Sequence, residues 1–198
     1  MAMNLPKDVF VHPNALCESQ TIGAGTRVWA FAHVMAGATV GRDCNICDGA
    51  YIEGAARIGD GVTVKNQVMI FDGVEIADQV FLGPGVTFTN DLRPRAFIKR
   101  GAAALLDTYV GRGATLGART TVVCGVTIGA YAFAGAGAVI ARDVPAHAFV
   151  VGNPARQIGW VCVCAARLRD NLVCDECGRV FRQETQELVL ASDPGTQQ

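Results

Sequence analysis

Polar side chains that could do chemistry gather between positions 72 and 100. Asp72, Asn90 and Asp91 supply carboxylate and amide groups, which can orient an amine or accept its proton. A run of basic residues follows, and it comprises Arg93, Arg95, Lys99 and Arg100. Guanidinium and ammonium groups bind the oxygens of a diphosphate or a carboxylate, so the run predicts an anion clamp. A solvated tether is the alternative interpretation.

Four cysteines near the C-terminus form a second candidate site. A C-x-C pair and a C-x2-C pair stand nine residues apart, at Cys162, Cys164, Cys174 and Cys177. Two close thiolate pairs suit a tetrahedral structural zinc site, and a segment this small could hardly bury enough core without a metal. We therefore predict these four as zinc ligands. The other cysteines follow the apolar pattern of the chain and are expected to pack in the core: Cys17, Cys44, Cys47 and Cys124.

Charge and composition exclude several function classes. The formal net charge of −1 and the pI near 6.3 leave no basic surface for nucleic acid. The N-terminus lacks the charged and apolar regions of a signal peptide, and no apolar run is long enough to span a membrane. Eight cysteines without a secretory signal indicate reduced thiols or metal ligands. These features predict a cytoplasmic protein.

The elements that position these residues follow a six-residue repeat. A large apolar or small residue recurs at every sixth position in two runs. The positions are Phe10, Leu16, Ile22, Val28, Val34, Val40, Ile46, Ile52, Ile58, Val64, Ile70, Ile76, Leu82, Phe88, and then Val110, Leu116, Val122, Ile128, Ala134 and Ile140. Six is not a multiple of 3.6, so a helix cannot place these residues on one face, whereas short strands joined by tight turns can. The repeat predicts an all-β chain folded as a parallel β-helix, in which each coil is buried by its neighbours.

The repeat is interrupted once. From Phe88 to Val110 there are 22 residues, which we interpret as roughly one coil replaced by a loop at 91–108. Four basic residues against two acidic ones give this loop a net charge of +2. Because loops on rigid scaffolds concentrate function, we expect the active site at the interruption.

The hexads resemble the hexapeptide-repeat, left-handed β-helix family of acyltransferases. Several segments are similar to the sugar-nucleotide N-acetyltransferases of that family: TRVWAFAHV, CNICDGAYIE, VTVKNQVMIFDGV, FLGPGVTFTND with the following PR, ATLGARTTVVCGVTIGAYAFAGAGAVI and VVGNPARQIGW. The resemblance implies three hexads per coil, and therefore six to seven coils. It also implies acetyl-CoA as co-substrate, a nucleotide-linked 3-amino sugar as acceptor, and a homotrimer with acetyl-CoA in the groove between neighbouring subunits.

The exact sugar is less defined. The stretch PARQIGW is similar to members that act on a UDP-linked 3-amino uronic acid, which we favour, in a step of surface-polysaccharide (lipopolysaccharide) biosynthesis. The stretches CNICD and FTND are shared with enzymes for dTDP-linked 3-amino-6-deoxyhexoses, so that acceptor, or a 4-amino sugar, is the alternative.

With three hexads per coil, residues 18 positions apart stack about 4.8 Å from one another. Asp72 and Asn90 have this spacing and should form a polar pair on one ridge of the column, above the small residues Ala36 and Gly54. A polar pair beside free space suits a substrate. A ladder that only closes turns is the alternative.

The proposed chemistry is attack of an amine on a thioester. A neutral amine needs mainly orientation, whereas a hydroxyl normally needs a histidine base. The three histidines are 21 and 114 residues apart, which favours an amine acceptor and argues against a metal-dependent hydratase with clustered histidine ligands. We expect Asn90 to hold the amine and Asp72 or Asp91 to accept its proton. Backbone N–H groups near Gly117 or Gly135 would bind the oxyanion.

Other residues are expected to contact the substrates. Candidates for the sugar nucleotide are Asn66, His33, Arg93, Arg95 and Lys99, although Asn66 and His33 also suit structural roles. The resemblance places the adenine end of coenzyme A near the GNPA turn, and glycine-rich coils let its pantetheine arm approach the backbone. The expected contacts are Gly117, Gly135, Ala136, Arg142, Gly152, Asn153, Pro154 and Arg156. Solvated surface is the alternative role for the two arginines.

Two domains are predicted. Residues 1–157 form the catalytic β-helix, and residues 158–198 form a zinc-ribbon-like extension that caps its open end or packs between subunits. A non-catalytic binding scaffold is the alternative for the whole chain, but the charged loop would then have no purpose.

Overall fold

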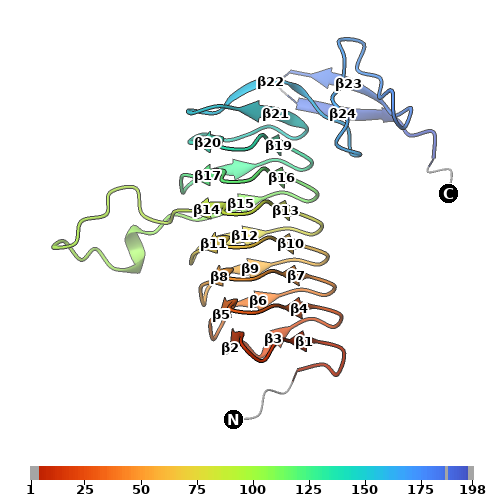
Figure 1. The fold of residues 1–198 in the computed structure, drawn as a ribbon. Coiled ribbons are helices and arrows are strands. Elements are labelled where there is room, and N and C mark those ends of the chain that lie inside the picture. The colour runs from red at the N-terminus through yellow and green to blue at the C-terminus, as the bar shows by residue number, and fades with distance from the viewer. Residues whose placement is uncertain (1–4, 186, 196–198) are drawn as a thin grey trace.

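The computed structural model describes residues 5–185 and 187–195 as an all-β column with almost no helix. Short strands wind into stacked coils, one long loop leaves the column, and a small unit lies beyond the last coils (Figure 1). The predicted all-β class and the parallel β-helix are confirmed. In the part of the chain that is described, no helix is long and apolar enough to cross a membrane.

Three sheets form the faces of the column. The first face has the strand order β1-β4-β7-β10-β13-β16-β19-β21-β22, and only β22 runs antiparallel to its neighbour. Its strands are β1 (Phe10–Val11), β4 (Arg27–Val28), β7 (Asn45–Ile46), β10 (Thr63–Val64), β13 (Phe81–Leu82), β16 (Thr115–Leu116), β19 (Phe133–Ala134), β21 (Ala148–Val151) and β22 (Arg156–Trp160).

The second and third faces are built in the same way. The second face holds β2 (Leu16–Cys17), β5 (His33–Val34), β8 (Tyr51–Ile52), β11 (Met69–Ile70), β14 (Thr87–Phe88), β17 (Thr121–Val122) and β20 (Val139–Ile140). The third face holds β3 (Thr21–Ile22), β6 (Thr39–Val40), β9 (Arg57–Ile58), β12 (Val74–Ile76), β15 (Thr108–Val110) and β18 (Thr127–Ile128). The loop contains one turn of 3-10 helix, η1 (Ala102–Ala104), and the C-terminal unit contains the hairpin β23 (Val180–Glu184) and β24 (Glu187–Ser192).

Successive coils are 18 residues apart, as the pairing of Thr63 with Phe81 on the first face illustrates. Within the described residues there are six complete coils and a seventh, whose third side is the bridge of Val144 to Ile128. This number agrees with the six to seven that were predicted. From Ile22 onward the apolar residue of each hexad faces the shared interior and is buried. The column is therefore a rigid support with its polar side chains on the outside.

The first two positions of the predicted repeat are wrong. Phe10 and Leu16 point outward and are 41% and 54% exposed, whereas Val11 packs on the core and Cys17 is buried. The reason is a register of 17 residues in the first coil, where Val11 pairs with Val28. Because neighbouring residues of a strand point to opposite sides, a shift of one residue exchanges the inward and outward sets.

The interruption does not replace a coil, contrary to the interpretation from the sequence. Strand β14 on the second face is followed by β15 on the third face, and β15 pairs with β12 as the next coil requires. The loop is thus an insertion of about 16 residues into one corner. The N–H of Leu106 donates to the carbonyl of Asn90 at 2.9 Å and closes the base of the loop, so the excursion spans 91–105.

Candidate active site

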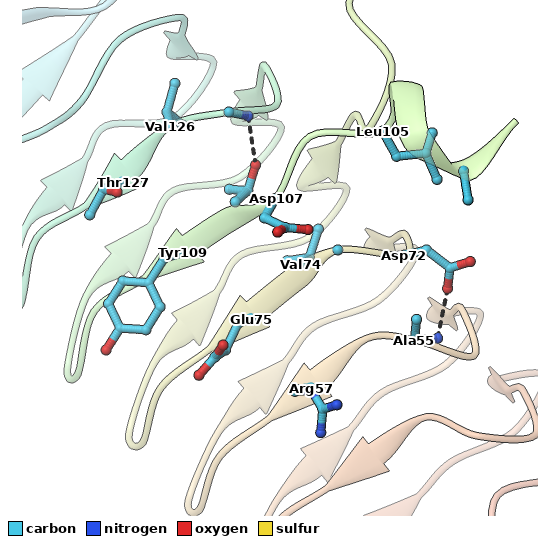
Figure 2. A pocket seen from close by; sticks show the side chains of 14 residues that line it. Ala55, Arg57, Asp72, Val74, Glu75, Leu105, Asp107, Tyr109, Val126 and Thr127 are labelled. Atoms are coloured by element: carbon cyan, nitrogen blue, oxygen red, sulfur yellow. Dashed lines mark hydrogen bonds between the residues drawn. The ribbon is translucent and has the colours of Figure 1, made fainter. Parts of the chain in front are cut away.

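A cavity of about 560 Å³ opens on the third face beside the base of the loop (Figure 2). Consecutive strands β9, β12 and β15 supply its floor through the outward-pointing Arg57, Glu75 and Tyr109. Asp72 and Asp107 come from the corner between the second and third faces, which we call the second–third edge. Leu105 of the loop also lines the cavity. The cavity therefore lies where the interruption of the repeat predicted a site.

Asp72 is fixed by the coil before it. Its Oδ1 accepts a hydrogen bond from the N–H of Ala55 at 2.7 Å, and its own N–H donates to Oε2 of Glu53 at 2.8 Å (Figure 2 shows the first). Burial, together with the charges of Glu53 and Asp72, raises the pKa of the nearby Tyr51. The Asp72 carboxylate is thus held in one orientation at the rim of the cavity.

Four lining residues were missed by the sequence reasoning: Arg57, Glu75, Asp107 and Tyr109. Asp107 lies against the edge near Asp72, because its Oδ1 would be 2.8 Å from a Cβ placed on Gly73. Among the described residues, no ion pair within 4.0 Å joins Arg57 to these carboxylates. Three carboxylates and one guanidinium therefore give the cavity an excess of negative charge.

A signal for part of this set was present in the sequence. The outward position of each third-face strand is a threonine in β3, β6 and β18. The same position holds Arg57, Glu75 and Tyr109 in the three coils between them. The cavity floor is therefore marked by a change of residue type at the outward positions, while the inward positions stay apolar.

Asn90 and Asp91 lie at the base of the loop. The pairing of Met69 with Thr87 agrees with the predicted stacking of Asp72 and Asn90 on one edge, three residues further along. Oδ1 of Asp91 accepts a hydrogen bond from the N–H of Arg93 at 2.7 Å and so shapes the first turn of the loop. Neither Asn90 nor Asp91 lines the cavity on the third face.

The basic residues of the loop surround a second hollow of about 510 Å³. Its lining includes Asp91, Arg95, Lys99 and Arg100, and it adjoins the first cavity at Leu105, which lines both. Arg93 is not part of the lining, and its carbonyl accepts a hydrogen bond from the guanidinium of Arg100. The structure thus brings Arg95 and Lys99 together, as an anion clamp requires.

Two predicted substrate contacts lie elsewhere. Asn66 is exposed on the corner between the first and second faces, outside both cavities. His33 lies on β5 of the second face, where its Nε2 is 3.0 Å from Oε2 of Glu18 and its ring contacts Tyr51. His33 is therefore engaged by Glu18 and Tyr51 on the second face, outside both cavities.

A third cavity, of about 310 Å³, lies at the last coils. Arg142, Pro154 and Arg156 line it, and Gly152 and Asn153 belong to the adjoining connection between β21 and β22. Arg142 stands on the second–third edge three coils beyond Asp72, by the strand pairs β11–β14, β14–β17 and β17–β20. Three coil spacings amount to about 14 Å, a length that an extended pantetheine arm can span.

The glycines of the upper coils have a structural reason. The N–H of Gly117 donates to the carbonyl of Ala134 and that of Gly135 to the carbonyl of Val150, both at 2.8 Å. These two donors belong to the ladder between coils and are engaged there, while an oxyanion donor among the N–H groups next to them stays a prediction. A Cβ on Gly117 would lie 2.6 Å from the N of Ala136, which shows how closely the coils approach there.

The four C-terminal cysteines meet as predicted. The sulfur atoms of Cys162, Cys164, Cys174 and Cys177 all lie within 4.8 Å of one another. The N–H of Arg179 lowers the pKa of Cys177 to about 6, while burial raises the pKa of Cys162 and Cys164. Four sulfur donors in this arrangement fit a tetrahedral zinc ion. The other four cysteines are buried in the column, as expected.

Comparisons with known proteins agree with the fold and with the resemblance. Residues 21–54 match the family model described as bacterial transferase hexapeptide (six repeats). The chain is 50% identical to a dTDP-3-amino-3,6-dideoxy-alpha-D-galactopyranose 3-N-acetyltransferase from Aneurinibacillus thermoaerophilus, over 87% of this chain and 90% of that protein.

Solved structures are similar as well. A hexapeptide-repeat acetyltransferase from Vibrio cholerae, complexed with acetyl coenzyme A, matches with a TM-score of 0.50 at 26% identity, over 59% of this chain and 67% of that one. The acetyltransferase domain of PglB from Neisseria gonorrhoeae, in complex with acetyl coenzyme A, matches with a TM-score of 0.49 at 23% identity. In that match this chain spans 56% of the other chain's length and 78% of its own.

Proposed function

This chain belongs to the hexapeptide-repeat family of sugar N-acetyltransferases, and we propose that it acetylates the 3-amino group of a dTDP-linked 3-amino-3,6-dideoxyhexose. The observation that carries this proposal is the 50% identity, along nearly the whole chain, to a curated enzyme of that specificity. The acetyl donor is acetyl-CoA, which is bound in the similar Vibrio cholerae structure.

The charge of the acceptor cavity supports an amine on a neutral sugar. The cavity attracts a sugar whose amino group is protonated, because it holds the carboxylates of Asp72, Glu75 and Asp107. The same carboxylates repel a negative charge on the sugar ring. A uronic acid would bring its carboxylate into this negative field. The UDP-linked uronic acid that the sequence favoured has no support from the comparisons, and the dTDP-linked 6-deoxy sugar takes its place here.

The reaction needs a neutral amine in line with the thioester. In this proposal Asp72 takes up the proton of the ammonium group, and Asn90, which follows it on the same edge one coil on, holds the amine nitrogen; the register of the coils and the fixed Asp72 carboxylate support these roles. The nitrogen then forms a bond to the thioester carbon, the carbon–sulfur bond breaks, and the departing thiolate takes the second proton of the nitrogen. Asp91, at the loop base, is the alternative base.

The substrates extend from the amine in two directions. The basic hollow of Arg95, Lys99 and Arg100 suits the diphosphate of the sugar nucleotide. The cavity of Arg142 and Arg156 suits the phosphates at the adenine end of coenzyme A. Because acetyl-CoA is an intracellular metabolite, a cytoplasmic enzyme in the assembly of surface polysaccharide fits this proposal.

A homotrimer is part of the proposal. The loop projects from the column (Figure 1) and holds large apolar side chains in solvent, with Phe97 81% and Leu92 54% exposed. Apolar side chains held in this way favour burial against a partner. A neighbouring copy of the chain would cover them and close the site from the side.

The C-terminal unit is proposed to hold one structural zinc ion. Cys162, Cys164, Cys174 and Cys177 would be its ligands, and zinc would replace the core that so small a unit cannot build. The unit's apolar cluster adjoins the column at Trp160, which packs against both. The role of the zinc is therefore to fold the unit, not to react.

The test is incubation with acetyl-CoA and a panel of dTDP- and UDP-linked 3-amino and 4-amino sugars, followed by mass spectrometry. A gain of one acetyl group on the dTDP-linked 3-amino-6-deoxyhexose, faster than on the UDP-linked uronic acid, is the expected result. The pair Glu75→Gln and Asp107→Asn should reduce that preference. Faster acetylation of the uronic acid by the unaltered enzyme would overturn the acceptor assignment, and no product with any amino sugar would overturn the reaction.

A further inference from the structure

Strand β22 supplies one wall of the cavity at the last coils. Arg156 and Gln157 at its beginning line this cavity together with Arg142. On the first face β22 is the last strand, and it pairs only with β21, in an antiparallel ladder whose register shifts between Phe149 and Val150. One edge of β22 therefore has no neighbouring strand in the described part of the chain, and something else has to hold it.

The C-terminal unit supplies that support through Arg167. Nη2 of Arg167 donates a hydrogen bond to the carbonyl of Ile158 at 3.1 Å. The same guanidinium lies over the ring of Phe149 on β21, 5.7 Å from its centroid, which is a cation–π contact. One side chain thus contacts both strands of the ladder.

The backbone around Arg167 is anchored on the same strand. Leu168 donates to the carbonyl of Trp160 at 2.9 Å, and Val161 bridges to Arg167 in antiparallel fashion. At Gly159 a Cβ would stand 3.6 Å from Nε of Arg167, so the guanidinium lies directly beside the backbone of β22. These contacts fix the end of the strand that directly follows Arg156 and Gln157.

We propose that Arg167 is a positioning residue for the coenzyme A end of the site. It fastens β22 to β21 so that Arg156 and Gln157 keep their places in the cavity wall. The inference rests on the proposed function, because it takes the cavity of Arg142 and Arg156 as the place of the coenzyme A phosphates. It also gives the C-terminal unit a task in substrate binding.

Arg167 is suited to a test because its replacement should leave the buried core of the C-terminal unit intact. The side chain is exposed, and the buried cluster of the C-terminal unit, formed by Cys162, Leu168, Cys174, Phe181 and Leu188, does not include it. Exposed polar substitutions normally change stability little. A matched control is Arg169, two residues on, which pairs with Asp175 at 2.8 Å and, among the described residues, makes no side-chain hydrogen bond or ion pair with β22.

The experiment compares the full-length variants Arg167→Met, Arg167→Lys and Arg169→Met with the unaltered protein. Coenzyme A affinity is measured by calorimetry without acceptor, and KM is measured separately for acetyl-CoA and for the amino sugar. We expect Arg167→Met to weaken coenzyme A binding and to raise the KM for acetyl-CoA about tenfold, the size expected for a lost charged hydrogen bond. Arg167→Lys should recover most of the affinity, because it keeps a cation and an N–H donor, and Arg169→Met should have no effect.

The outcomes separate this inference from the proposed function. An unchanged affinity for coenzyme A in Arg167→Met, or an equal rise of both KM values, would overturn the role of Arg167 while acetylation by the unaltered enzyme still stands. A protein that binds coenzyme A but acetylates none of the sugars refutes the function, and the calorimetric comparison still decides the role of Arg167. An unaltered protein that does not bind coenzyme A overturns both.

Discussion

Glu53 accepts a hydrogen bond from the backbone N–H of Asp72 at 2.8 Å, between successive coils on the second–third edge. Together with the bond from Ala55 to Oδ1, this contact holds the Asp72 carboxylate at the rim of the acceptor cavity. Among the described residues, the second oxygen of the carboxylate has no hydrogen-bond partner. This oxygen is therefore able to accept a hydrogen bond from a ligand. The contacts with Glu53 and Ala55 of the preceding coil set the orientation of the carboxylate.

Replacement of Asp72 by asparagine should separate binding of the amine from folding. The asparagine oxygen can still accept the bond from Ala55, so the melting temperature should change by no more than a few degrees. The lost charge removes a charge-assisted contact with the ammonium group and the base that takes up its proton, which should lower kcat/KM for the amino sugar by about tenfold or more. Steady-state kinetics with each substrate varied in turn checks this. If the KM for acetyl-CoA rises instead, Asp72 contacts acetyl-CoA and its assignment to the amino sugar is wrong.

Asn90 should contribute to rate and not to stability. Its backbone carbonyl closes the base of the loop by accepting a hydrogen bond from Leu106, and an alanine retains that bond. Asn90→Ala should therefore melt like the unaltered protein, whereas kcat/KM should fall about 10²-fold because an orienting hydrogen bond is lost. The exposed Asn14→Ala is the control and should change neither quantity. If Asn90→Ala instead unfolds early and keeps its rate per folded molecule, the Asp72–Asn90 pair is a structural ladder.

The coil architecture was predictable because its signal is periodic and buried. From Ile22 onward every sixth residue faces the core, and a single sequence suffices to see it. The prediction for the first coil was wrong at Phe10 and Leu16 because both residues are apolar, as are their inward neighbours Val11 and Cys17. An apolar pattern alone cannot choose between two adjacent registers when both residues fit.

The site was predictable only in part. Asp72 was found because it lies 18 residues before Asn90, where the repeat breaks. Glu75 and Asp107 were missed because they occupy outward positions, which the repeat does not constrain and which become neighbours only when coils stack. The structural task of the glycines also becomes visible only when coils stack. Gly117 is required by the approach of the next coil, and its N–H serves the ladder rather than a ligand.

Removal of the metal should unfold the C-terminal unit and leave the column intact. We expect one zinc ion per chain by elemental analysis, and none in Cys177→Ser, because the pKa of Cys177 is lowered to about 6 and its thiolate is then available as a ligand near neutral pH. The control Cys124→Ser, in the column, should keep the ion. Treatment with a chelator should expose the hairpin β23–β24 to proteolysis before any part of the column is cut. Full zinc content in Cys177→Ser would contradict the ligand assignment.

His147 should make the junction between the column and the C-terminal unit sensitive to acid. The ring stacks on Tyr131 with centroids 5.2 Å apart, meets Phe181 at 5.1 Å, and its Nδ1 lies 3.0 Å from the carbonyl of Val161. Burial lowers the pKa of His147 below its usual value of 6.5, because the apolar surroundings disfavour the charged ring. His147 therefore binds a proton at a lower pH in the folded protein than in the unfolded chain.

The sign of the pH dependence follows from this difference. Above pH 6.5 both states carry a neutral ring, and His147 has no effect on the pH dependence of stability. As the pH falls below that value the unfolded chain binds the proton first, so the free energy of unfolding decreases until the folded-state pKa is reached. The melting temperature should therefore fall between pH 7 and pH 5 more steeply in the unaltered protein than in His147→Phe, which keeps a ring but cannot titrate. Cysteine protonation acts on both proteins alike, so the difference between their slopes isolates His147. Equal slopes would show that the buried ring is not what couples this junction to acid.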